Sequence, residues 1–176
     1  STADTTTFDI ANVPTVTVAT PAPITAANQA TYVVTGTCTS SAGLVSLSVG
    51  TLATSVTCAA GTYTTAINVS ALPEGTVAIV AAQTNLTGTG TDSKNTTKDT
   101  IALPVVVTAP DNGATVAPNP TITGTGEPGA TVTVKEGGTV VCTATVEADG
   151  TWTCASSLGA GTHTLSSTQV DPLGNV

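Results

Sequence analysis

Charged and aromatic residues are scarce in this chain, and their scarcity excludes several classes of function. Only 8% of the 176 residues are charged, 2% are aromatic, and the net charge is −8. There is no arginine, and the cations are Lys94, Lys98 and Lys135. Nucleic-acid binding depends on neutralising phosphates, so this composition speaks against a nucleic-acid partner. With one Trp, two Tyr and one Phe, a carbohydrate-binding platform of exposed aromatic rings is also disfavoured.

Long apolar runs and helical patterns are missing as well. No run approaches the roughly 20 apolar residues that a helix needs to span a bilayer, and no signal peptide is recognisable. No stretch keeps the 3.6-residue period of an amphipathic helix over several turns. Thr, Val and Ala with scattered Gly and Pro are abundant instead, and β-branched residues suit strands. We predict an all-β protein with no membrane span and with the hydroxyl-rich acidic surface of an extracellular protein.

The side chains that catalysis requires are also sparse. His163 is the single histidine, and no nucleophile and carboxylate stand near it at a known motif spacing. Paired carboxylates can do acid–base work only when they are brought together, and the acids here are scattered singly. Glu136 is followed by two glycines and is typical of a turn. We expect no enzymatic activity.

Four cysteines fall two to each half of the chain: Cys38 and Cys58, then Cys142 and Cys154. The lack of a Cys-x-x-Cys motif and the single histidine speak against zinc. Disulfides within each half are the favoured use and imply an oxidising compartment. The alternative is that the thiols are small apolar core residues. The turn signal at 147–150, between Cys142 and Cys154, favours a bridge across a hairpin.

The two halves are repeats of about 90 residues. Residues 1–14 match residues 91–104 at an offset of 90, in the pairs Thr6/Thr96, Thr7/Thr97, Asp9/Asp99 and Pro14/Pro104. Residues 83–86 correspond to 169–172 at an offset of 86, which places Val176 opposite Gly90. The chain is therefore interpreted as two repeats cut in phase, with the last strand of the second repeat carried at the front.

Alternating apolar and polar residues between Gly and Pro turns predict the strands. In the first repeat they are 14–19, 30–39, 44–49, 51–58, 62–69, 76–84 and one within 88–100. In the second repeat they are 104–108, 121–125, 130–135, 139–146, 151–156 and 161–170. Short strands at this spacing predict two tandem immunoglobulin-like β-sandwiches, the second without its last strand. Tyr63 and Trp152 occupy equivalent positions and are predicted core anchors.

Three segments carry a family resemblance. They are Thr-Gly-Thr-Gly-Glu-Pro-Gly-Ala-Thr-Val-Thr-Val at 123–134, Asp-Gly-Thr-Trp at 149–152 and Asp-Pro-Leu-Gly-Asn at 171–175. In these the chain resembles the bacterial Ig-like repeats of large surface adhesins and biofilm-associated proteins. The resemblance implies a non-enzymatic extracellular module that spaces, adheres or assembles, in a family whose repeats often hold calcium at their junctions.

The missing strand suggests how copies of the chain assemble. An incomplete sandwich leaves an open sheet edge, and residues 1–13 match the strand that is missing, so they are a candidate donor strand. Thr6, Phe8, Ile10 and Asn12 fall on one face of that segment. The domains are then 1–13 as an extension, 14–100 as the first Ig-like domain and 101–176 as the second.

Two readings of function follow. In the first, the chain is the subunit of an extracellular filament that grows head to tail by donor-strand complementation between copies, because a heterologous contact that does not close makes a fibre. In the alternative, the chain is a two-repeat spacer from a long cell-surface adhesin or biofilm matrix protein. The expected partners of the chain are further copies of itself, in a head-to-tail polymer, and other cell-surface components.

Two kinds of surface site are also candidates. Asp92, Asp99, Asp111 and Asp171 lie near predicted domain ends, where oxygen ligands can bind calcium. Ordinary turn chemistry is the alternative for these residues. No other cofactor is expected. Asn68, Asn85 and Asn95 fit the Asn-x-Ser/Thr pattern of glycosylation, which arises easily by chance in a Thr-rich chain.

Overall fold

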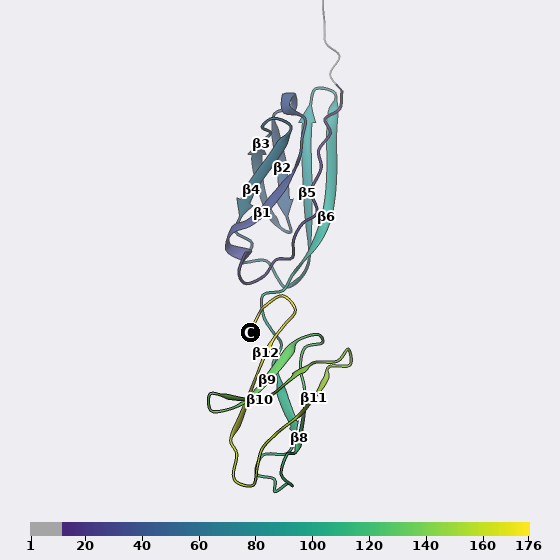
Figure 1. Ribbon diagram of the computed structural model, residues 1–176. Helices are drawn as coiled ribbons and strands as arrows, with labels where there is room; N and C mark the ends of the chain where they lie inside the picture. The colour runs from purple at the N-terminus through teal and green to yellow at the C-terminus, as the bar shows by residue number, and fades with distance from the viewer. Residues whose placement is uncertain (1–11) are drawn as a thin grey trace, which may run out of the picture. The chain divides into compact units, whose positions relative to one another are not determined.

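The computed structural model describes residues 12–176, so the predicted donor residues Thr6, Phe8 and Ile10 lie outside the described part of the chain. The chain divides into two compact units after Lys98, and the second unit is Asp99–Val176 (Figure 1). Apart from the short 3-10 helices η1 (Gln29–Thr31) and η2 (Ser40–Ala42), the regular elements of residues 12–176 are strands, which confirms the all-β prediction. None of the helices described there is long and apolar enough to cross a membrane.

The first unit is a sandwich of two antiparallel sheets. Its strands are β1 (Tyr32–Thr37), β2 (Leu44–Val49), β3 (Leu52–Thr57), β4 (Thr62–Ile67), β5 (Gly75–Asn85) and β6 (Gly88–Lys98). One sheet has the order β3-β2-β5-β6, and the other pairs β1 with β4. Residues 15–19 lie along β1 through backbone hydrogen bonds, Thr17 N to Thr37 O and Ala19 N to Thr35 O, without forming a regular strand.

Alternation along the strands places the core between these sheets. On β2, Val45, Leu47 and Val49 are all buried, while Leu44 and Ser46 face outward. Val16, Val18 and Ile24 close the same core from the segment that precedes β1. The apolar side chains that follow the period-2 rule thus form one interior, and the threonines between them face solvent.

The second unit repeats this plan without an equivalent of β6 among its described strands. Its strands are β7 (Val106–Ala109), β8 (Thr121–Thr125), β9 (Thr131–Glu136), β10 (Thr139–Thr145), β11 (Thr151–Ala155) and β12 (Leu165–Val170). The sheets are β10-β9-β12 and β11-β8-β7. By strand order, β10-β9-β12 corresponds to β3-β2-β5, and no described strand of the second unit corresponds to β6.

A glycine opposite a large aromatic side chain recurs in both units. Gly36 is paired with Tyr63, and Gly124 with Trp152. A Cβ added at Gly124 would lie 2.0 Å from the backbone oxygen of Val106 and 2.4 Å from the Trp152 ring. Both aromatic side chains are buried. The space that these rings occupy explains the glycine in Val-Thr-Gly-Thr at 34–37 and in Ile-Thr-Gly-Thr at 122–125.

Each unit contains one disulfide, Cys38–Cys58 in the first and Cys142–Cys154 in the second. The prediction of a bridge across a hairpin for Cys142 and Cys154 is wrong. Cys142 lies on β10 and Cys154 on β11, and these strands belong to different sheets. The turn at 147–150 therefore carries the chain from one sheet to the other, and the disulfide joins the two layers of the sandwich.

One predicted strand is shorter than the alternation suggested. The alternation predicts a strand over residues 161–170, but β12 begins only at Leu165, and His163 precedes it. The equivalent residues of the first unit belong to β5, which is paired with β6 over its full length. Because no described strand of the second unit holds residues 161–164 on that side, they do not join the ladder.

Candidate functional site

The outer edge of β12 is the first candidate site. Whereas β5 lies between β2 and β6, β12 is paired only with β9 among the described residues. Its unpaired backbone N–H and C=O groups are therefore free to accept another strand. The second unit thus presents an open edge at the position where the first unit is closed.

Side chains near this edge are less buried than their equivalents in the first unit. Val77 and Ile79 of β5 are buried, but the residues at the same positions, His163 and Leu165, are exposed and half-buried. Val18 is 3% exposed, whereas Val107, the equivalent residue on β7 of the second unit, is 38% exposed. The apolar surface that β6 covers in the first unit is therefore partly open in the second.

A hollow of about 260 Å³ lies beside the open edge. We call it the edge hollow. Its lining comes from the segment before β7, from β12 and from the last residue: Ala102, Leu103, Pro104, Val105, Thr168, Gln169 and Val176. The lining contains no charged side chain, so this hollow suits a strand or an apolar side chain better than an ionic ligand.

The one predicted donor residue that the structure describes is Asn12, which is exposed. Its backbone oxygen accepts a hydrogen bond of 2.7 Å from Asn85 Nδ2. Asn85 is at the end of β5, so the chain enters the first unit beside the β5–β6 turn.

An acidic cluster in the second unit is the other candidate site. Carboxylate oxygens of Asp99, Glu127 and Asp171 lie within 4.8 Å of one another. Asp99 begins the unit, Glu127 follows β8 and Asp171 follows β12. The fold thus brings together two of the four predicted calcium ligands and adds Glu127, which the sequence analysis missed.

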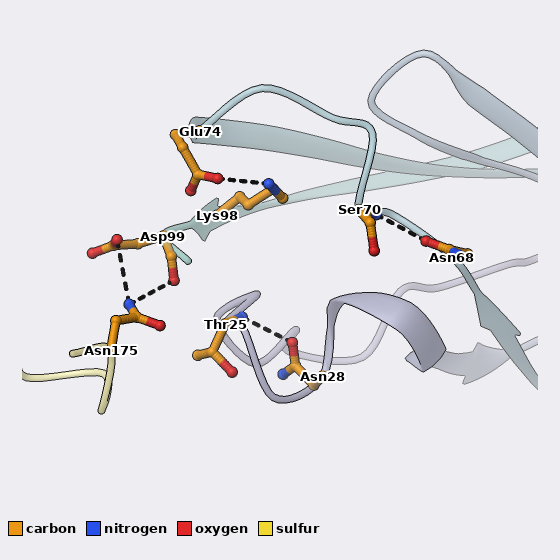
Figure 2. Close-up of polar contacts among 8 residues, drawn as sticks. All are labelled: Thr25, Asn28, Asn68, Ser70, Glu74, Lys98, Asp99 and Asn175. Carbon is orange, nitrogen blue, oxygen red and sulfur yellow. Dashed lines mark hydrogen bonds and ion pairs between the residues drawn. The ribbon is translucent and has the colours of Figure 1, made fainter. Parts of the chain in front are cut away.

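Hydrogen bonds fix this cluster. Asn175 Nδ2 donates to Asp171 Oδ2 at 2.6 Å. It also donates to the backbone oxygen of Asp99 at 3.1 Å (Figure 2). Asp171 Oδ1 accepts the backbone N–H groups of Leu173 and Asn175. Glu127 Oε2 accepts the N–H of Leu103 at 2.8 Å. Burial raises the pKa of Asp171, but these hydrogen bonds outweigh it and hold the pKa below its usual value.

The remaining predicted ligands lie elsewhere. Asp92 is on β6 of the first unit, where its Oδ2 accepts the N–H of Val18 at 2.8 Å. Asp111 follows β7, and its backbone oxygen accepts the N–H of Ala114. Neither residue belongs to the acidic cluster. Asp92 makes a contact between β6 and the segment before β1, and Asp111 lies in a turn, as the turn-chemistry alternative expected. That these two residues hold calcium stays a prediction.

The cluster fits calcium in the kind of ligand that it offers. Carboxylate oxygens are the hard ligands that calcium prefers, but calcium takes roughly six to eight oxygens, and three side chains supply only part of that set. Within residues 12–176, every buried side-chain N or O atom already has a hydrogen-bond partner.

The first unit has neutral residues where the second has acids. Gln83 and Gln169 are equivalent, because their Oε1 atoms accept the backbone N–H groups of Thr39 and Glu127 respectively. Thr39 thus stands in place of Glu127. By the same repeat offset, Asn85 stands in place of Asp171. Comparing the two repeats position by position is the sequence signal that would have singled out Glu127.

The asparagines of the glycosylation pattern differ in their surroundings. Asn68 follows β4 and is exposed, and Asn95 is exposed on β6. Asn85 is half-buried, and its side chain hydrogen-bonds both to Asn12 and to the Asn85–Gly88 turn.

A larger hollow of about 710 Å³ in the first unit offers little chemistry. It is lined mainly by threonines, with Tyr63 as its only titratable side chain. The Tyr63 hydroxyl donates to the backbone oxygen of Thr17 at 2.8 Å, and burial raises its pKa. His163 contacts Glu136, with 3.0 Å between Nδ1 and Oε1, and no nucleophile accompanies that pair in the described residues.

Residues 107–176 match the family model of the bacterial Ig-like domain. Most of the second unit is therefore similar to bacterial Ig-like domains. This finding confirms the resemblance stated from the sequence, and the two sheets described above agree with it. Two disulfides, together with this similarity, indicate an extracellular location. No curated protein matches the chain.

Solved structures that are similar to the chain include the following three. The BSP domain of a biofilm-associated protein is 23% identical with a TM-score of 0.33, and the match covers 88% of this chain and 27% of that one. A chimeric titin Z1Z2 carrying a decorin peptide is 12% identical with a TM-score of 0.36, covering 93% of both. An ICAM-5 D1–D4 ectodomain fragment is 18% identical with a TM-score of 0.43, covering 94% of this chain and 47% of that one. This chain thus spans about a quarter of the biofilm-associated structure.

Proposed function

We propose that this chain is a structural, non-catalytic part of a bacterial surface adhesin or biofilm matrix protein, in which Ig-like units follow one another and space other domains. The open edge of β12 is the observation that carries the proposal. The last strand of the first unit, β6, leads at once into Asp99 and the second unit. A tandem arrangement supplies such a closing strand to every unit that has another after it.

The chemistry of the described residues agrees with a spacer. Each sandwich has its two sheets joined by a disulfide, a link that survives in an oxidising environment and limits how far a unit opens under load. Threonine and serine are common at the exposed positions, where charged residues are few. Such a surface suits hydration outside the cell and offers no cluster of nucleophile, base and orienting group.

A filament subunit is the second candidate function, and the match between residues 1–13 and the β6 region favours it. Here residues 1–13 of one copy close residues 101–176 of its neighbour, and repetition makes a fibre. The two candidates share the same strand pairing. They differ in whether a peptide bond joins the closing strand to the unit that it completes.

Antibodies against the chain test the proposal on intact cells. Surface labelling of unbroken cells, lost after mild protease treatment, is the expected result for an adhesin or matrix protein. Labelling that requires broken cells would contradict it. The mass of the native polypeptide then separates the candidates: a species near 17.0 kDa supports the filament subunit, and a very long polypeptide supports the array.

A further inference from the structure

We propose that residues 1–8 of a second copy bind along β12 as its missing neighbour, in the register that β6 has with β5, with Phe8 as the anchor. This inference rests on the filament candidate of the proposed function, because it names the segment of a second copy that completes the second unit. It is argued from the repeat, from an ion pair in the first unit and from the reach of the chain.

The repeat gives the register. In the first unit Val80 is paired with Ser93, Val77 with Thr96 and Gly75 with Lys98. The residues of the second unit that are equivalent to these β5 residues lie 86 positions later in the chain. The donor residues that are equivalent to the β6 residues lie 90 positions earlier. The same register therefore pairs Ser166 with Ala3, His163 with Thr6 and Gly161 with Phe8.

The buried positions of β6 can be compared one by one with the equivalent donor residues. Only Thr96 and Lys98 are buried on β6. Thr96 Oγ1 donates to the backbone oxygen of Ala22, and its donor equivalent is Thr6, which keeps the hydroxyl. The other buried position changes from Lys98 to Phe8.

That change is matched on the acceptor. Lys98 is 3% exposed, and its Nζ lies 2.6 Å from Glu74 Oε1 (Figure 2). The residue equivalent to Glu74 in the second unit is Ala160. A buried ammonium without its carboxylate would be costly, so a lysine would not suit this position. Phe8 in place of the buried lysine and Ala160 in place of the partly exposed glutamate turn this ion pair into an apolar contact.

The donor must come from a second copy because the chain's own residues 1–11 cannot reach. Residue 12 is held beside Asn85, at one end of the β5–β6 hairpin. The second unit begins after Lys98 at the other end of β6, about 33 Å away at strand rise. Eleven extended residues span at most about 40 Å, so almost none would be left to pair with β12.

The first experiment measures binding of a synthetic peptide of residues 1–13 to the chain lacking residues 1–11, which keeps every described residue. We expect saturable binding, weakened roughly tenfold or more by Phe8→Lys in the peptide. Thr7→Lys adds the same charge on the outward face and is the matched control, with an effect under about threefold. Ala160→Glu in the acceptor should restore binding of the Phe8→Lys peptide, because it recreates the Lys98–Glu74 pair.

The second experiment tests the register in the full-length chain. Ala3→Cys in one copy and Ser166→Cys in another should form a disulfide-linked dimer on mild oxidation, since opposite residues on antiparallel strands are close. Ala3→Cys with Thr164→Cys, two residues out of register on the same face, should link far less.

Absence of peptide binding, equal weakening by the two lysine variants, or failure of Ala160→Glu to rescue would overturn the inference. A cross-link that favours the slipped pair would overturn the register. The proposed function fails by a different observation, namely lack of surface labelling, so the two failures are distinguishable.

Discussion

At the scale of single residues, two glycines decide how the aromatic cores are filled. Gly36 and Gly124 each lie under a ring and beside a backbone oxygen from the neighbouring segment. In a chain with so few aromatic residues, each ring supplies a large share of its small core. The position opposite each ring must therefore carry no side chain.

Gly124→Ala tests this packing. The added methyl would overlap Val106 and Trp152, so we expect the second unit to lose about 2 to 3 kcal/mol of unfolding free energy. Trp152, the only tryptophan, reports the transition by fluorescence in a urea titration. Gly138→Ala is the control, because no atom lies within 4 Å of its added Cβ. Equal effects of the two substitutions would refute the packing argument.

At the scale of elements, the closing strand and the segment before β1 hold each other in the first unit. Asp92 on β6 accepts the N–H of Val18, and Ile24 N donates to Thr97 O at 2.9 Å. The hydrogen bond from Val18 is the main reason that the pKa of Asp92 is lowered. The second unit has no described strand at the position of β6, and Val107 is accordingly more exposed than Val18.

Asp92→Asn tests this link through its pH dependence. A carboxyl whose folded pKa is depressed contributes stability above its unfolded pKa of about 3.9 and loses it as the pH falls through the folded value. We expect the melting temperature of the first unit to fall between pH 5 and pH 2, and to fall less in the variant, which is also less stable at pH 7. Near-UV circular dichroism of Tyr32 and Tyr63 follows this unit.

The Trp152 transition of the same samples is the internal control, because Asp92 belongs to the other unit. Its acid dependence should be unchanged by the substitution. Parallel pH profiles of the first unit in the two proteins would show that the Asp92 hydrogen bond contributes no stability.

At the scale of the whole molecule, the two repeats have the same plan but different ends. The second unit carries the acidic cluster and the open edge, while the first has Thr39 and Asn85 in place of two of the acids and is closed by β6. A ligand of either site should therefore stabilise the second unit and leave the first unchanged.

Calcium tests that difference. At a concentration about 100 times its Kd, an ion stabilises the unit that binds it by about 2.7 kcal/mol. We expect the Trp152 melting temperature to rise by roughly 10 to 20 °C in calcium, to fall back in chelator, and to become insensitive to calcium in Glu127→Gln. Asp111→Asn is the control that should keep the response. A response that survives Glu127→Gln would place the ion elsewhere.

The amino-acid sequence by itself determined the local structure of this protein. Alternating apolar and polar residues set the strands, because side chains on a strand point to opposite faces, and the repeat offsets set which strands correspond. Only the tertiary structure decided which sheet each strand joins. That is why Cys142 and Cys154 link two layers instead of spanning a hairpin, and why residues 161–164 do not join β12. It also decided that Glu127 and Asp171 meet Asp99, because contacts between residues far apart in the chain depend on how the sheets pack and not on local pattern.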